Sequence, residues 1–142
     1  MPREIKFRAW DKTIKMWITG LLVFDGQGKV YLRDPNTNVI TEYHQLFNSL
    51  EVVWYTGLKD KNDKEIYEGD ILRCESNYIR LQTNEQTGKK SIKFYEVVWH
   101  EVMFTTKRID NGHINPLVTS PSIWKNYYEV IGNIYENPGL LK

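Results

Sequence analysis

This sequence of 142 residues has little alanine, little cysteine, no long apolar run and almost no net charge. Ala9 is the single alanine, whereas there are 13 isoleucines and 10 valines. Alanine is the best helix former, and β-branched side chains lose rotamer freedom in a helix but pack well on a pleated sheet. The shortage of alanine therefore counts against a helical protein, and the aliphatic residues that are present predict strands.

The other shortages exclude several classes of protein. Cys74 is the only cysteine, so an internal disulfide is excluded and a reducing compartment is expected. No stretch approaches the roughly 20 apolar residues of a membrane-spanning helix, and no apolar leader follows the N-terminus. A formal charge of +1 gives no general attraction to nucleic acid or to an anionic membrane. We expect one cytoplasmic domain, residues 1–142, with no membrane contact.

Alternating apolar and polar residues and frequent turn residues predict the fold class. Ile5 to Trp10 alternate as a half-buried strand does, and Met16 to Ile18 continue as its hairpin partner. Similar short strands recur to Tyr135, which predicts an all-β domain: a small barrel-like or strongly curved antiparallel sheet with one or two short helical turns. The expected core consists of Phe7, Trp10, Trp17, Val53, Tyr55, Ile66, Tyr67, Ile71, Val97, Trp99, Phe104, Val130, Ile131 and Ile134.

Local patterns predict where this sheet is interrupted. Apolar residues at helical spacing predict a short helix over residues 43–50, and a helical turn is expected over residues 122–126. Residues 79–94 predict an exposed hairpin that turns at Thr87-Gly88. His100-Glu101 should divide the most apolar strand region in two, and Asn111-Gly112 is typical of a hairpin turn.

An acidic segment between residues 60 and 70 invites two chemical interpretations. An EF-hand loop that begins at Asp60 would need an oxygen ligand at the fifth position, which Lys64 occupies, and glycine at the sixth, which Glu65 occupies. Glu65, Glu68 and Asp70 could serve acid–base catalysis, but nothing in the sequence places a partner group opposite them. We expect structural roles instead, with Gly69 forming a turn and Asp70 capping it through backbone N–H groups.

No arrangement typical of an active site, a metal site or a cofactor site is present. The three histidines, His44, His100 and His113, share no metal-ligand spacing with one another or with Cys74. Cys74 lacks a neighbouring base in the sequence, and the segment 26–29 lacks the spacing of a phosphate-binding loop. The sequence therefore predicts a protein that is not an enzyme and that binds no cofactor or metal. An enzyme whose site is assembled from distant residues remains the alternative.

Two zones are locally basic, residues 1–15 and residues 78–93. In the first zone aromatic residues alternate with the cations, and rings beside positive charge can bind single-stranded nucleic acid. The other interpretation is an ordinary strand with charges facing outward and rings facing inward. The candidate nucleic-acid contacts are Arg3, Lys6, Arg8, Lys12, Lys89 and Lys90.

Three blocks of sequence resemble the YopX family of phage and prophage proteins. They are Phe7-Arg8-Ala9-Trp10-Asp11 with Met16-Trp17, the stretch from Tyr55-Thr56-Gly57-Leu58 to Glu68-Gly69-Asp70-Ile71, and Val130-Ile131-Gly132-Asn133-Ile134-Tyr135-Glu136-Asn137-Pro138. The resemblance implies a mainly β fold of small-barrel character and a phage or prophage gene, and it implies no reaction. Gly57, Gly69 and Gly132 suit turns or close backbone approach. The family usually has glycine where Asp63 stands, and a left-handed backbone conformation is less favourable for aspartate than for glycine.

Two functions follow as expectations. The first is a non-enzymatic accessory protein that binds another protein, including a second copy of itself, because aromatic residues are abundant and the net charge is near zero. An exposed apolar patch or open sheet edge would support it. The alternative is a small β-barrel that binds nucleic acid through the two basic zones.

Overall fold

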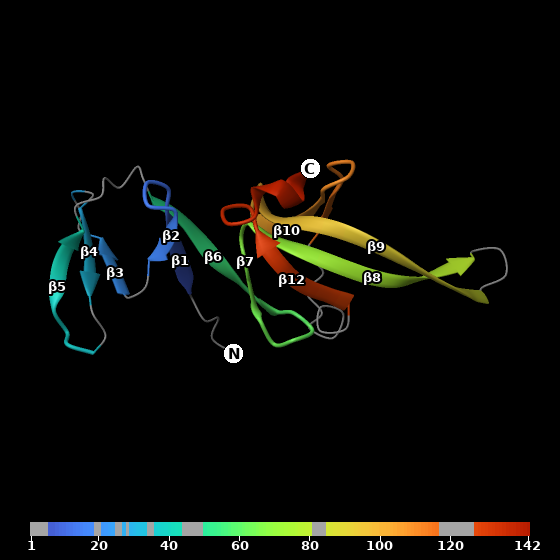
Figure 1. The fold of residues 1–142 in the computed structure, drawn as a ribbon, viewed down its shortest axis with the longest axis horizontal. Helices are drawn as coiled ribbons and strands as arrows, with labels where there is room; N and C mark the ends of the chain where they lie inside the picture. The colour runs from blue at the N-terminus through green and yellow to red at the C-terminus, as the bar shows by residue number, and fades with distance from the viewer. Residues whose placement is uncertain are drawn as a thin grey trace. The chain divides into compact units, whose positions relative to one another are not determined.

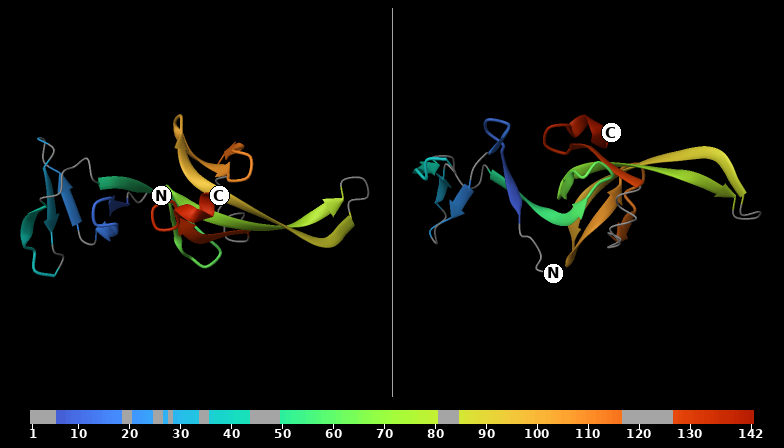
Figure 2. Two further views of the ribbon diagram at one scale, coloured as in Figure 1. Left: turned by 45° about the horizontal axis from the view of Figure 1, so that its top comes forward. Right: turned by 90° about the horizontal axis from the view of Figure 1, so that it is seen from below.

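The computed structural model describes residues 6–18, 21–24, 27, 29–33, 36–43, 50–80, 85–116 and 127–142. Most of the described residues belong to strands, and the main sheet is antiparallel and curled into a half-barrel (Figures 1 and 2). The predicted all-β class and strongly curved sheet are thus confirmed. Contacts divide the chain into two compact units, one of Met1–Lys6 and Trp54–Lys142 and the other of Phe7–Val53.

Short antiparallel strands build the unit Phe7–Val53. β1 (Phe7–Asp11) pairs with β2 (Met16–Ile18), and β3 (Leu21–Phe24), β4 (Val30–Arg33) and β5 (Ile40–Tyr43) form a three-stranded sheet. The β1–β2 turn is capped by buried Asp11, whose Oδ1 accepts hydrogen bonds from the N–H groups of Thr13 and Ile14. The core gathers around Ala9 and Leu50, with Phe7, Ile18, Leu32 and Val52 packed against them.

The five-stranded sheet belongs to the unit that contains the C-terminus. Its order is β11-β10-β9-β8-β12, and every neighbouring pair is antiparallel. β6 (Leu50–Lys59) runs from one unit into the other and pairs near its end with β7. The remaining elements are β7 (Glu65–Tyr67), β8 (Asp70–Arg80), β9 (Glu85–His100), β10 (Met103–Arg108), β11 (Ile114–Pro116), β12 (Tyr128–Asn133) and a short 3-10 helix, η2 (Pro138–Leu141).

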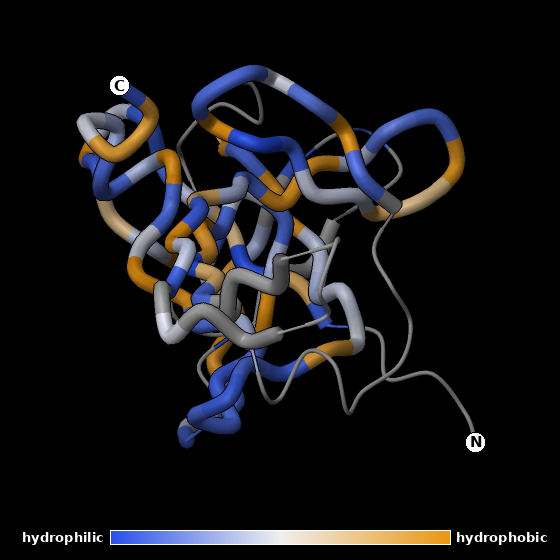
Figure 3. The backbone as a smooth tube through the Cα atoms, turned by 90° about the vertical axis from the view of Figure 1, so that its right-hand side faces the viewer, coloured by the Kyte–Doolittle hydropathy of each residue, from blue (hydrophilic) through white to orange (hydrophobic). Residues whose placement is uncertain are grey.

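Side-chain alternation gives this sheet one buried face. Ile66, Leu72, Tyr95 and Val97 form its core, and Tyr95 contacts Tyr128 edge to face with ring centroids 5.9 Å apart. Hydrophobic and hydrophilic residues succeed one another along the backbone (Figure 3), as expected where one face of a strand is buried. No helix among the described residues is long and apolar enough to cross a membrane.

β8 and β9 extend as a two-stranded arm beyond the rest of the sheet (Figures 1 and 2). Within the described residues, β12 pairs with β8 as far as Cys74, and β10 pairs with β9 from Tyr95 onward. The β8–β9 pairing nevertheless continues to Arg80 opposite Glu85. The predicted hairpin therefore exists, but the predicted turn at Thr87-Gly88 is wrong, because Gly88 lies inside β9 with a φ of 69°.

Other local predictions had mixed outcomes. β9 ends at His100 and β10 begins at Met103, which confirms the predicted division, and a turn at Asn111-Gly112 joins β10 to β11. Tyr43 and Leu50, the ends of the expected helix, lie in β5 and β6. Residues 44–49, between them, and residues 122–126, where a helical turn was expected, lie outside the described residues.

Two members of the expected core are exposed. Trp99 has 51% of its surface exposed, because it lies one residue before the end of β9, where the sheet no longer covers it. Ile131 is 36% exposed, because the strand register is irregular between Val130 and Gly132. Residues missing from the predicted core include Ala9, Leu50, Leu72 and Tyr95, all of which are buried.

Candidate protein-binding groove

Alternation along β9 leaves two large apolar side chains outside the core. Tyr95 and Val97 point into it and are at most 9% exposed. Ile92 and Phe94, two residues apart on the same strand, are 48% and 43% exposed. Since successive side chains of a strand point to opposite faces, Ile92 and Phe94 occupy the face opposite Tyr95.

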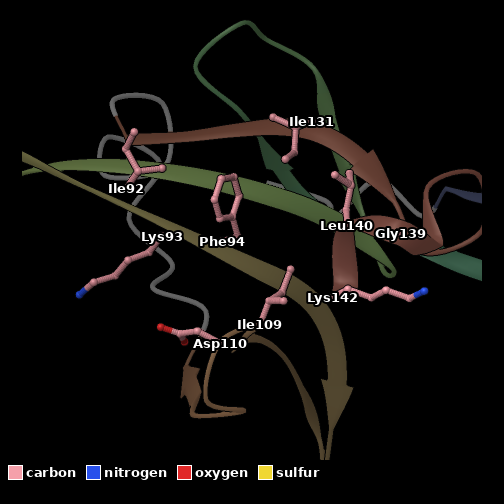
Figure 4. A pocket seen from close by; sticks show the side chains of 9 residues that line it. All are labelled: Ile92, Lys93, Phe94, Ile109, Asp110, Ile131, Gly139, Leu140 and Lys142. Carbon is pink, nitrogen blue, oxygen red and sulfur yellow. The ribbon is translucent and has the colours of Figure 1, made fainter.

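A β-bulge brings Ile131 to the groove. Val130 pairs with Leu72 and Gly132 pairs with the adjacent Ile71, so Ile131 is the additional residue on β12. Figure 4 shows its side chain among those that line the hollow with Ile92 and Phe94. A bulge of this kind re-aims a side chain, so Ile131 is exposed although it was expected in the core.

The C-terminal turn forms another part of the groove, and Gly132 permits its close approach. A methyl group on Gly132 would lie 2.5 Å from Asn137 Oδ1. Asn133 Oδ1 accepts hydrogen bonds from the N–H groups of Tyr135 and Glu136, and Asn137 Oδ1 accepts one from Asn133 N–H. These contacts hold the turn that leads into η2, where Leu140 is 40% exposed.

The hollow between these elements has a volume of about 600 Å³, within the range of about 300–1,000 Å³ typical of ligand sites. Ile109 lies beside Phe94, since its N–H donates a hydrogen bond to the Phe94 carbonyl at 3.1 Å. We call this hollow the groove (Figure 4); its lining residues are Ile92, Lys93, Phe94, Ile109, Asp110, Ile131, Gly139, Leu140 and Lys142.

Three charged residues, Lys93, Asp110 and Lys142, border the groove. Asp110 is already paired with Arg108. Lys93 and Lys142 have no ion pair within the described part of the chain. Lys93 lies between Ile92 and Phe94 on β9, so its side chain points to the opposite face of the sheet. Figure 4 shows the side chains of Lys93 and Lys142 directed away from the apolar lining, which suits an apolar partner segment.

The candidate nucleic-acid contacts that the structure describes are mostly engaged with carboxylates or rings. Lys6 Nζ lies 2.6 Å from Glu65 Oε1, and Lys12 Nζ lies 3.0 Å from Glu51 Oε1. Lys90 pairs with Glu75, which also binds Arg73. The Arg8 guanidinium stacks over the Trp17 ring at 4.2 Å. Lys6 and Lys90 belong to one unit, and Arg8 and Lys12 belong to the other.

Two further candidates cannot be placed at the level of side chains. Arg3 lies outside the described residues, and so does the side chain of Lys89, whose backbone belongs to β9.

Gly69 and Asp70 lie at the turn that leads into β8, as predicted, whereas Gly57 lies inside β6, where the pairing with β7 is irregular. Asp70 Oδ2 accepts a hydrogen bond from Tyr67 N–H at 2.8 Å. Gly57 and Gly69 have φ angles of 87° and 82°, in the region that favours glycine. A methyl group on Gly69 would lie 3.1 Å from the Tyr135 ring.

The candidate calcium loop is held by backbone amides. Asp60 is 1% exposed, and its Oδ1 accepts hydrogen bonds from the N–H groups of Asn62 and Lys64. Its Oδ2 accepts a third from Val130 N–H, 70 residues away in sequence. One carboxylate thus closes the turn before β7 and attaches it to β12. Asp63, where the family usually has glycine, has a φ of 62°.

The groups considered for catalysis remain apart among the described residues. His100 and His113 are exposed, and His44 lies outside the described residues. Burial raises the pKa of the Cys74 thiol, which lowers the fraction of reactive thiolate. No group of three or more histidine, cysteine, aspartate or glutamate residues in the described chain could hold a metal ion.

Comparison with known proteins identifies the family of this chain. The YopX protein family model matches residues 6–142. This chain belongs to the YopX family. The resemblance of the three sequence blocks is thereby confirmed, and the match runs through both compact units. A search of curated proteins finds no match.

Solved structures of two other proteins share the fold. Protein EF1440 from Enterococcus faecalis is 28% identical with a TM-score of 0.61, and the alignment covers 99% of this chain and 100% of that one. YopX from Bacillus subtilis is 20% identical with a TM-score of 0.58, and the coverage is 96% and 97%. Neither name states an activity, so the site has to be argued from this chain's own residues.

Sequence reasoning missed most of the groove. Ile92 and Phe94 were assigned to an exposed hairpin arm without a role, and Ile109 and Leu140 were not singled out. The sequence did contain one indication of the groove, the pair Ile92 and Phe94. Two apolar residues that are two positions apart in a strand lie on the same face, so they indicate an apolar face on this arm. No signal of that kind existed for Leu140, which reaches the groove only through the turn after β12.

Proposed function

We propose that this YopX family member is a non-enzymatic accessory protein of a phage or prophage, which acts in the host cytoplasm by binding another protein through the groove. The observation that carries the proposal is the exposed pair Ile92 and Phe94 beside Ile131 and Leu140. Apolar side chains gathered in one hollow are typical of an interaction site, whereas isolated exposed ones are not.

The apolar lining defines the partner's chemistry. Ile92, Phe94 and Leu140 are each at least 40% exposed, so a partner segment that carries apolar side chains can bury them. Catalysis is not favoured, because the groove's titratable side chains are two lysines and an aspartate already paired with Arg108.

Nucleic acid is the alternative partner. It is less favoured because Lys6, Lys12 and Lys90 each lie against a glutamate, which reduces the positive field that a phosphate backbone would meet. DNA binding whose affinity falls steeply with salt would overturn the proposal in favour of this alternative.

Site-specific photocrosslinking in phage-infected host cells tests the proposal. A photoreactive residue replaces Ile92 in the groove, and the matched control carries it at Ile14, which is 50% exposed in the other unit. We expect protein adducts at position 92 that survive nuclease, disappear when Leu140→Asn is added, and are absent at position 14. Adducts that nuclease removes, or equal adducts at both positions, would contradict the proposal.

A further inference from the structure

One wall of the groove is held less firmly than the others. Ile92, Phe94 and Ile131 belong to strands of the five-stranded sheet, whereas Leu140 belongs to η2, which contains no buried residue and no side-chain cap. The backbone of η2 is held by short-range bonds, from Leu140 N–H to the Asn137 carbonyl at 3.0 Å and from Lys142 N–H to the Gly139 carbonyl at 3.4 Å. A segment with few buried contacts and local hydrogen bonds opens easily.

This wall has a fixed base and a point at which it can turn. Asn137 is fixed, because its Oδ1 accepts a hydrogen bond from Asn133 N–H and fills the space that Gly132 leaves. Gly139, two residues later, has no atom within 4 Å of the position that a side chain would take. Glycine adopts many backbone conformations, so the segment Gly139–Lys142 can rotate while Asn137 stays in place.

The segment carries a leucine beside the groove that does not line it. Leu140 and Lys142 both belong to the lining, and Leu141 between them does not, although 38% of its surface is exposed. On the other side of the hollow, Ile92 and Phe94 are 48% and 43% exposed. Removing both sets of apolar surface from water together is favourable.

We infer that the segment Gly139–Lys142 is a lid, which turns about Gly139 and places Leu141 over Ile92 and Phe94 when no partner is bound. Gly139 itself lines the groove, and the two residues from Gly139 to Leu141 span up to about 7 Å. The structure has the open arrangement, whose hollow of about 600 Å³ leaves room for a leucine side chain (Figure 4).

The lid regulates the site of the proposed function, on which this inference rests. Leu141 and an apolar partner segment compete for the same lining, so a partner binds the open molecules only. The lid contributes one leucine and loses conformational freedom when it closes, so the two states should differ little in free energy. The partner's apparent affinity then falls in proportion to the fraction of molecules that are open.

Disulfide trapping in the full chain tests the lid without any partner. Phe94→Cys and Leu141→Cys are combined in a Cys74→Ser background and oxidised with glutathione disulfide, since two cysteines can bridge only when their Cα atoms come within about 7 Å. The matched control pairs Leu141→Cys with Trp99→Cys, because Trp99 is 51% exposed on the same strand but lies outside the lining.

We expect the 94–141 disulfide to form at least about tenfold faster than the 99–141 disulfide. Equal rates, or no disulfide in either variant, would overturn the inference. Circular dichroism should show the same strand content in both variants.

Nuclear magnetic resonance of the unaltered chain gives a second test that needs no cysteine. With labelled leucine methyl groups, we expect nuclear Overhauser contacts between Leu141 and the Phe94 ring, and exchange of the Leu141 methyl signals on the microsecond to millisecond timescale. A Leu141 side chain with a single environment and no contact to Phe94 would overturn the lid.

Failure of the lid is distinguishable from failure of the proposed function. Leu141→Asn should raise the yield of protein adducts at position 92 at least about twofold, and Leu141→Met, which keeps an apolar side chain, should leave it unchanged. Adducts that depend on Leu140 but not on Leu141 overturn the lid and leave the groove as a binding site. Selective trapping of the 94–141 disulfide without any adducts supports the lid and overturns the proposed function.

Discussion

Single polar and small residues hold the local geometry on which the groove depends. Gly132 admits the Asn137 side chain, and the Asp60 carboxylate joins the turn before β7 to β12. Buried polar groups that are fully hydrogen-bonded are costly to disrupt, since the loss of one partner leaves the other unsatisfied. The loss of stability caused by a substitution should therefore depend on the contacts at that position and not on the type of residue replaced.

Two glycines illustrate this expectation. Gly132→Ala should destabilise the protein by about 2 kcal/mol or more, because the new methyl group would lie 2.5 Å from Asn137 Oδ1. Gly57→Ala should cost about 1–2 kcal/mol, because only the φ of 87° opposes it and no atom lies within 4 Å of the new methyl group. Urea unfolding of both variants gives the comparison, and a smaller loss for Gly132→Ala would contradict it.

The ion pair between Lys6 and Glu65 should make stability depend on pH. The hydrogen bond from the Lys6 ammonium holds the pKa of the Glu65 carboxyl below its ordinary value of 4.5. A carboxyl whose pKa is lower in the folded state stabilises the protein above its unfolded pKa, and this contribution disappears as the pH falls through the folded value. Stability should therefore decrease below pH 4.5, and Glu65→Gln should flatten this part of the profile.

Urea midpoints measured at intervals from neutral pH downward check the effect of Glu65. Lys6→Met is the matched control, since it removes the same pair from the other side and should flatten the profile as Glu65→Gln does. An unchanged acid slope in both variants would show that other carboxyl groups control it.

At the scale of the element, the β8–β9 arm differs from the sheet that it leaves. Between Glu75 and Arg80 the described part of β8 pairs with β9 alone, and two-stranded hairpins are marginally stable in water. At Tyr95 and Glu96, β9 pairs with β8 and with β10 at once, so its backbone is paired on both sides there. Local opening should accordingly be much easier in the arm.

Native-state hydrogen exchange measures this difference. Amide protons of β9 from Glu85 to Lys90 should exchange at least about tenfold faster than those of Tyr95 and Glu96. Equal protection along the whole of β9 would mean that a further strand or a partner covers the arm in solution.

At the scale of the molecule, the pairing of distant strands should control folding speed. β12 pairs with β8, so Tyr128 meets Cys74 across more than fifty residues of chain. The loop must close before these contacts stabilise it, which makes such topologies fold slowly. Refolding followed by stopped-flow tryptophan fluorescence should take milliseconds to seconds, and a microsecond phase that restores the whole signal would contradict this.

The sequence allowed the fold class to be predicted, because β-branched residues and alternation depend only on neighbouring positions. It allowed Ile66, Ile71 and Val97 to be predicted as core for the same reason. The groove escaped prediction, since it depends on the bulge at Ile131 and on the turn that brings Leu140 beside it. The bulge is defined by the pairing of β12 with the distant β8, and the turn by the contact between Gly132 and Asn137, and neither is visible in the alternation of apolar and polar residues.

The bulge in β12 also bears on how the chain can tolerate changes of length. Val130 and Gly132 already pair with the adjacent residues Leu72 and Ile71, so removing Ile131 would restore a regular ladder and leave the other side chains of β12 on their present faces. Natural relatives that lack this residue should consequently keep the polar and apolar pattern of the strand and lose only the apolar side chain that it contributes to the groove. A survey of deletions in YopX genes would therefore show whether the groove varies independently of the sheet that supports it.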